Sequence, residues 1–275
     1  MRDRTMKNLN KLMTGASIAA ALFAGSASAG VLNGGYSIQV AQIFEYASVD
    51  SNGNGVIDVV GEQLGGIGNI QSITSSSGDI LWTTGTGGQE LTFSFDGYTA
   101  GVIQPAGFGQ FNIAFYGGSV KFYLDGAQNF NAAGGPLGGA IGTATDGAFF
   151  MELLGGSGIV AAGFDPLLGV GGTTLLSTLN GLTSPFTGSG FGYLDVNLAN
   201  LGLAGDFYDR NGMIGANGEE RDFLLESSFN ATEGQNAGWP VGGTASLTGI
   251  PEPGTLALMG LGVLAMGFAS RKRAK

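Results

Sequence analysis

The 275-residue chain contains no cysteine and no histidine. Without them it cannot form thiolate or imidazole zinc sites or bind haem through these residues. It also has no Cys nucleophile and no His base. A metal ion in this protein would therefore have to be held by oxygen atoms.

Charge is also scarce, and basic residues are the scarcer kind. Only 12% of residues are charged and the formal net charge is −10, which excludes a nucleic-acid partner because a polyanion needs a basic surface. Eight of the eleven basic residues lie near the two ends of the chain. Residues 30–249 keep three basic residues against 19 acidic ones, a net charge of −16. Such a surface repels anionic lipids and acidic polymers unless divalent cations bridge them.

Long amphipathic helices are missing, whereas glycine is abundant, with 53 residues. Apolar and polar residues alternate with a period of two over 36–40, 90–98 and 119–125, which predicts β-strands. Further strands are expected over 110–116, 148–154, 192–198 and 222–229. Gly117-Gly118 would be a two-residue hairpin link, and a short helix would lie within 167–179. The pattern predicts an all-β fold, either an antiparallel β-sandwich or a jelly roll, with glycines mainly in tight turns.

The first 29 residues have the features of a secretory signal peptide. Lys7 and Lys11 precede an apolar run over 12–24, and Ala27-Ser28-Ala29 offers the small side chains that signal peptidase accepts. The apolar run is too short to anchor across a bilayer core of about 30 Å. We expect an N-terminal signal helix cleaved after Ala29, with Met1 or Met6 as the true start. A buried helix of the fold is the alternative.

The other end combines three features in order. Pro251-Glu252-Pro253 is stiff because proline fixes φ. An apolar stretch over 254–270 would rise roughly 25 Å as a hydrophobic helix. Arg271-Lys272-Arg273 follows it and would stay cytoplasmic, as basic residues flanking membrane segments usually do. The alternative is an ordinary membrane anchor that is never processed.

In this order and spacing, the segment resembles the PEP-CTERM sorting domain. The resemblance covers only about the last 25 residues. It implies a Gram-negative bacterium that makes exopolysaccharide. It also implies that a membrane enzyme, exosortase, recognises the tail and releases the protein or transfers it to the cell surface after a transient inner-membrane stage. The chain thus divides into a signal peptide (1–29), an acidic glycine-rich β domain (30–249) and a sorting signal with a transmembrane helix (250–275).

One internal motif resembles the calcium loop of EF-hand and dockerin modules. It places oxygen-bearing side chains at loop positions 1, 3, 5 and 9, and glycine at position 6. The candidate ligands are Asp50, Asn52, Asn54, the Val56 carbonyl, Asp58 and Glu62. The bidentate acid belongs at position 12, which is Gly61, and Glu62 stands one place too late. The motif is therefore interpreted either as a weak calcium site or as a surface turn without a metal ion.

A second acidic patch runs through Asp206 and Asp209 and on to Glu219, Glu220 and Asp222. Paired carboxylates could serve a glycoside hydrolase, but solvated loop acids are the commoner use of such residues. Trp82 and Trp239 could form a sugar-stacking platform or fill the core.

These observations predict a non-enzymatic, exported protein of the cell surface or extracellular matrix. Residues 188–196 and 223–229 are loosely similar to flocculation-associated PEP-CTERM proteins, which favours a place in exopolysaccharide, biofilm or floc. The expected partners are signal peptidase and exosortase during export, and extracellular polysaccharide afterwards. No cofactor is certain, and calcium is the only candidate. The alternatives are a calcium-dependent carbohydrate-binding domain and a carboxylate glycoside hydrolase.

Overall fold

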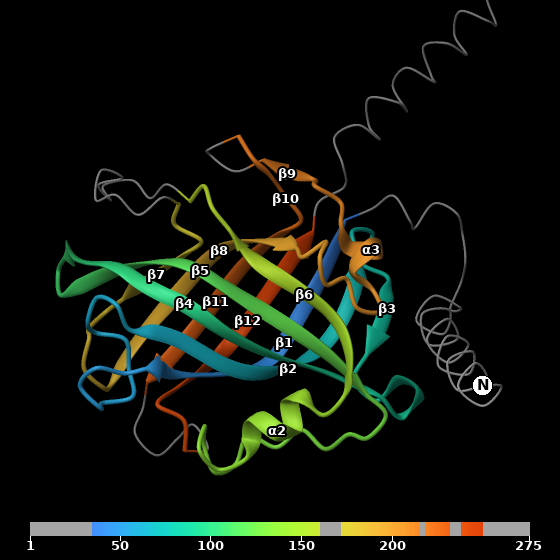
Figure 1. Cartoon of the computed structure of the whole chain (residues 1–275), viewed down its shortest axis with the longest axis horizontal. Coiled ribbons are helices and arrows are strands. Elements are labelled where there is room, and N and C mark those ends of the chain that lie inside the picture. The colour runs from blue at the N-terminus through green and yellow to red at the C-terminus, as the bar shows by residue number, and fades with distance from the viewer. Residues whose placement is uncertain (1–34, 160–171, 215–217, 232–237, 250–275) are drawn as a thin grey trace, which may run out of the picture.

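The computed structural model describes residues 35–159, 172–214, 218–231 and 238–249 (Figure 1). The predicted signal helix, the cleavage residues Ala27 and Ala29, and the C-terminal hydrophobic helix lie outside these residues. None of the helices in the described ranges has the length and hydropathy needed to span a lipid bilayer.

The described residues form a mainly antiparallel β fold. One sheet holds ten strands, and a separate pair consists of β9 (Met213–Ile214) and β10 (Glu220–Arg221). The helical elements are short: α2 (Ala140–Thr145), α3 (Gly205–Tyr208) and the 3₁₀ turn η2 (Thr86–Gly88). The strands of the large sheet are β1 (Tyr36–Val49), β2 (Gln63–Ser75), β3 (Ile80–Thr83), β4 (Glu90–Gly107), β5 (Gln110–Asp125), β6 (Ala148–Gly156), β7 (Leu175–Leu179), β8 (Phe186–Val196), β11 (Phe223–Ala231) and β12 (Val241–Gly249).

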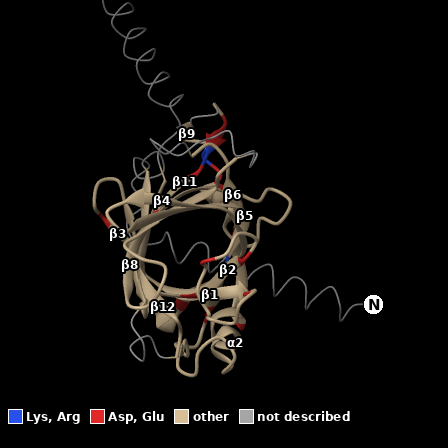
Figure 2. Ribbon diagram, turned by 90° about the vertical axis from the view of Figure 1, so that its left-hand side faces the viewer, with Lys and Arg blue, Asp and Glu red and all other residues tan. Residues whose placement is uncertain are grey.

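The large sheet closes on itself. Its order is β1-β12-β11-β8-β6-β5-β4-β2-β3, and β1 also pairs with β2, which joins the two sides of the sheet. Two walls consequently face each other across the core (Figure 2). The predicted antiparallel all-β fold with facing layers is confirmed, and its layers are two walls of one continuous sheet.

Alternate residues of the strands fill the space between the walls. Ile38, Phe93, Phe122, Met151 and Leu194 are among the most deeply buried side chains of this core. A second, smaller apolar cluster lies on the outer side of the sheet, where α2 packs against it. Its members are Phe44, Ile67, Ala132, Ala140, Ala144 and Trp239.

Trp82 and Trp239 are 2% and 3% exposed. Trp82 belongs to the main core and Trp239 to the outer cluster. Of the two uses open to these residues, the structure favours core packing, because neither ring is accessible for stacking on a sugar.

The predicted hairpin at Gly117-Gly118 is wrong. β5 runs unbroken through both glycines, and the turn that joins it to β4 lies at Phe108-Gly109, where φ is 52° and 77°. Gly118 has φ of 86°, and a Cβ there would lie 2.4 Å from the ring of Tyr98. The glycine therefore makes room for a cross-strand aromatic ring rather than a turn.

The predicted helix within 167–179 is also wrong for its described part. Leu175–Leu179 form β7, which pairs with β5 and β8. The strands expected over 148–154 and 222–229 correspond to β6 and β11, and the strand expected over 192–198 overlaps the end of β8.

Candidate functional site

Both ends of the folded body lie side by side. Tyr36, the first residue of β1, pairs with Gly249, the last residue of β12, and Phe223 pairs with Gly249 on its other side. The segments expected to direct export, residues 1–29 and 250–275, therefore attach at the same end of the closed sheet. The predicted sorting residues Pro251, Glu252, Pro253, Arg271, Lys272 and Arg273 lie outside the described residues.

The predicted calcium loop follows the other end of β1. With 14 residues, this strand separates the loop from the attachment end by roughly 43 Å. Asp50 accepts hydrogen bonds from the backbone N–H groups of Asn52, Gly53 and Gly55, at 3.2, 2.7 and 2.7 Å. The bond from Gly55 is the main reason that the pKa of Asp50 is lowered. Asp50 thus organises the loop as an anion that holds backbone amides.

Three of the predicted ligands converge above this turn. The amide nitrogens of Asn52 and Asn54 donate to the two carboxylate oxygens of Asp58, at 2.8 and 2.7 Å. The Asn54 side-chain oxygen accepts a bond from the Val56 N–H at 2.9 Å. These residues therefore lie close together and bond to one another.

Glu62 lies beneath the loop and is 1% exposed. It accepts bonds from the N–H and hydroxyl of Ser51 and from the N–H groups of Asp58 and Val59. Burial opposes the charge of Glu62, but these bonds outweigh it and lower its pKa. Glu62 therefore links the start of the loop at Ser51 to its end at Asp58 and Val59. Over the described ranges, no group of three or more acidic side chains is placed to hold a metal ion, and calcium binding stays a prediction.

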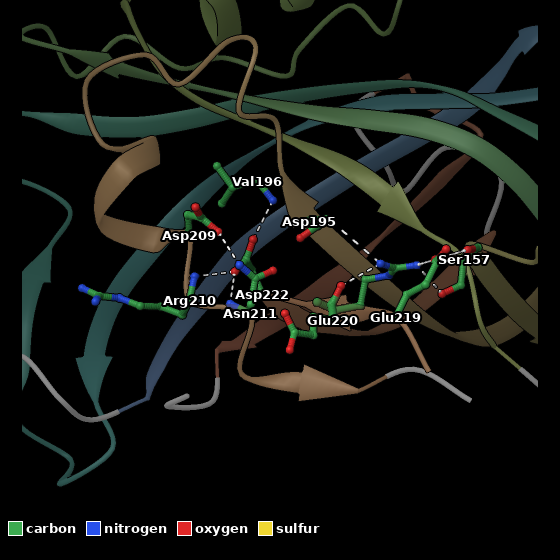
Figure 3. Close-up of polar contacts among 10 residues, drawn as sticks. Ser157, Asp195, Val196, Asp209, Arg210, Asn211, Glu219, Glu220 and Asp222 are labelled. Atoms are coloured by element: carbon green, nitrogen blue, oxygen red, sulfur yellow. Dashed lines mark hydrogen bonds and ion pairs between the residues drawn. The ribbon is translucent and has the colours of Figure 1, made fainter. Parts of the chain in front are cut away.

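The second acidic patch forms a hydrogen-bond network near the attachment end (Figure 3). Asp222 is 1% exposed and accepts bonds from the N–H groups of Val196, Arg210 and Asn211. It thereby ties the end of β8 to the segment that follows α3. Asp206, in contrast, is exposed.

Arg221 is the buried cation of this network. It contacts the carboxylates of Glu219 and Asp195, and it donates to the Glu220 carbonyl and to Ser157. Burial, followed by the hydrogen bond and the charge of Asp222, raises the pKa of Asp195. The two carboxyls are thus neighbours, and Asp222 is already held by three backbone N–H groups. This arrangement suits a structural role.

Sequence reasoning missed the carboxyl inside the closed sheet. Glu45 is 7% exposed, lies between the walls beside Phe93, Phe95 and Tyr98, and has no hydrogen-bond or ionic partner among the described residues. Burial raises its pKa to about 7. Strict alternation from Val40 would place position 45 outside. A β-bulge between Val40 and Ile43 turns it inward instead.

Comparison with known proteins identifies the end of the chain. The PEP-CTERM protein-sorting motif matches residues 249–273, which include the Pro-Glu-Pro and the Arg-Lys-Arg runs. The resemblance seen in the sequence is confirmed for this segment, and the match begins at the last residue of β12. No curated protein and no solved structure matches the chain. The similarity to flocculation-associated proteins therefore stays a prediction.

Proposed function

We propose that this chain, which carries a PEP-CTERM sorting motif, is a non-enzymatic protein of the bacterial cell surface or extracellular matrix. The motif supports export and exosortase-mediated processing. The observation that carries the proposal is the position of the motif, which starts at Gly249 where β12 ends. All strands of the closed sheet precede it, so removal of the tail would leave the body whole.

The composition of the body supports a place outside the cell. Its net charge of −16 keeps it soluble and repels other anionic surfaces. Divalent cations could bridge it to acidic exopolysaccharide in a biofilm or floc. The paired attachment points at one end would orient the body during a transient inner-membrane stage, with the Asp50 loop directed away from the membrane.

A calcium-dependent carbohydrate-binding domain is the second candidate. It is favoured by the convergence of Asn52, Asn54 and Asp58 in one exposed loop. Calorimetry with polysaccharide, with and without a chelator, tests it directly. Heat that is insensitive to the chelator, or no heat at all, would remove this candidate.

A carboxylate glycoside hydrolase finds less support. Both oxygens of Asp222 accept bonds from backbone N–H groups, and the neighbouring Asp195 lies 3.9 Å from the Arg221 guanidinium. Both carboxyls are engaged by groups of the protein itself, which favours a structural role over acid–base catalysis.

Mass spectrometry of the mature protein from its native host tests the sorting proposal. We expect a species that lacks residues 1–29 and the C-terminal hydrophobic and basic part of the sorting signal. Replacing Arg271, Lys272 and Arg273 with alanine should leave the tail uncleaved, because the variant would lose the basic cluster that is expected to hold the end of the hydrophobic helix on the cytoplasmic side. The matched control, Arg271→Lys with Arg273→Lys, keeps the charge and should be processed normally. Recovery of the full-length chain from the cell interior would contradict the proposal.

A further inference from the structure

A groove of about 230 Å³ lies on the outer face of the sheet over β1, β2, β4 and β5, beside α2. It is smaller than the roughly 300–1,000 Å³ typical of sites for drug-sized ligands, and its size suits one small ring. Its lining mixes aromatic and polar groups. Tyr46, Asp96, Lys121 and Tyr123 are among the residues that line it.

Two half-buried tyrosine rings border the groove, and each is held by a second aromatic ring. Tyr46 packs edge-to-face on Trp239, with centroids 5.5 Å apart, and Tyr123 packs the same way on Phe149 at 6.1 Å. Trp239 is itself fixed, since its indole N–H donates to the Ala132 carbonyl at 2.8 Å. The rings are therefore in place before any ligand arrives, which lowers the entropy cost of binding.

An acceptor and a donor also line the groove. Asp96 is oriented by bonds to its Oδ1 from the Ser48 hydroxyl and the Gly97 N–H, at 2.8 and 2.7 Å. Its Oδ2 accepts no bond from the described residues. Lys121 is the only lysine of residues 30–249. Its side chain is 47% exposed and is 3.8 Å from Glu152, which leaves ammonium hydrogens available.

We propose that this groove binds one neutral hexopyranose unit of an extracellular polysaccharide. The apolar face of the sugar would lie on the tyrosine rings, Asp96 would accept from one hydroxyl, and Lys121 would donate to a neighbouring one. A neutral sugar is favoured over a uronic acid because the body carries a net charge of −16. This inference rests on the proposed function and names the ligand class of a surface protein.

Titration calorimetry of the full chain with dextran, mannan and alginate tests the inference. We expect binding of at least one neutral polymer, weaker or no binding of alginate, and no effect of a chelator, since Lys121 rather than a metal supplies the positive charge. Tyr123→Ala should weaken binding about tenfold or more, and Tyr123→Phe should retain it. Lys121→Met should also weaken it.

The matched control is Tyr193→Ala. Tyr193 is half-buried on β8, away from the groove, and packs edge-to-face on Phe191 at 5.5 Å, so its removal should leave binding unchanged. Three results would overturn the inference: no heat with either neutral polymer, preference for alginate, or equal losses for Tyr123→Ala and Tyr193→Ala. Loss of binding in the presence of the chelator would also contradict the inference, because it would indicate that the sugar binds at the Asp50 loop rather than in the groove. None of these results alters the processed mass that tests sorting.

Discussion

Two of the buried carboxyls of this protein, those of Asp222 and Glu45, lie in opposite surroundings. Asp222, at the attachment end, accepts three backbone N–H bonds at 1% exposure. Glu45, between the walls, is 7% exposed and has no partner among the described residues. Burial removes water from both groups, but only Asp222 receives hydrogen bonds in its place.

The two carboxyls therefore differ in their effect on stability: Asp222 stabilises the fold, whereas Glu45 destabilises it when it is ionised. Asp222 connects β8, α3 and β11, so it stabilises the end from which both export segments leave (Figure 3). Glu45 adjoins a cavity of about 50 Å³ whose other polar groups are hydroxyls, among them Ser177 and Ser227. Nothing there compensates a negative charge, and the group stays neutral up to higher pH.

The largest effect is expected from Asp222→Ala. The variant leaves the N–H groups of Val196, Arg210 and Asn211 without their acceptor, at about 1–3 kcal/mol for each buried group. We expect a loss of about 3–5 kcal/mol in the free energy of unfolding, measured by urea denaturation at pH 7. Asp206→Ala, at an exposed position nearby, should cost less than about 0.5 kcal/mol. Equal effects of the two variants would remove the structural role of Asp222.

Glu45→Gln tests the other half of the comparison. The folded pKa of about 7 lies above the ordinary value of 4.5. Glu45 therefore costs stability progressively as pH rises from about 4.5 to 7, and the cost is constant above that. At pH 8 the variant should be more stable than the wild type by up to about 3 kcal/mol, and at pH 4 the two should be equal.

Urea denaturation at pH 4, 6 and 8 measures this difference. The control is Glu226→Gln, an exposed position on β11, which should change stability little at any pH. If Glu45→Gln and wild type keep the same stability difference from pH 4 to pH 8, Glu45 is not held neutral by the fold.

Sequence patterns predicted the strands of this protein better than their arrangement. Alternation at 90–98 and 119–125 reflects burial on one face, which is a local property, and both segments are strands. Closure depends on β1 pairing with both β2 and β12, and Gly249 lies more than 200 residues from Tyr36. No local pattern records such a pairing.

The same limit applies to the candidate sites. The motif from Asp50 to Asp58 is contiguous, so its residues lie close together in one loop. Gly117-Gly118 has the composition of a turn, but packing of the Tyr98 ring overrides it. Glu45 faces inward only because the bulge after Val40 shifts the alternation by one residue.

Lys121→Met gives the smallest expected effect on stability. It tests Glu152, a buried carboxyl that is held partly by hydrogen bonds and partly by an ion pair. Glu152 is mostly buried, and its charge is held chiefly by the side-chain amides of Asn197 and Asn200, at 2.7 and 2.9 Å. Burial opposes that charge, but these bonds, with Lys121 as a lesser contributor, lower the pKa of Glu152. Removing Lys121 should therefore cost less than about 1 kcal/mol at low salt.

Urea denaturation at low and at high sodium chloride measures that cost, which should shrink as salt screens the pair. Glu152→Ala is the matched comparison. It should lower the free energy of unfolding by more, because it leaves both asparagine amides and the lysine without their acceptor. A loss for Lys121→Met as large as that for Asp222→Ala would mean that ion pairing, rather than hydrogen bonding, holds buried carboxylates in this fold. The raised pKa of Glu45 would then be due to the distance from Glu45 to the nearest cation, and not to the lack of N–H donors between the walls.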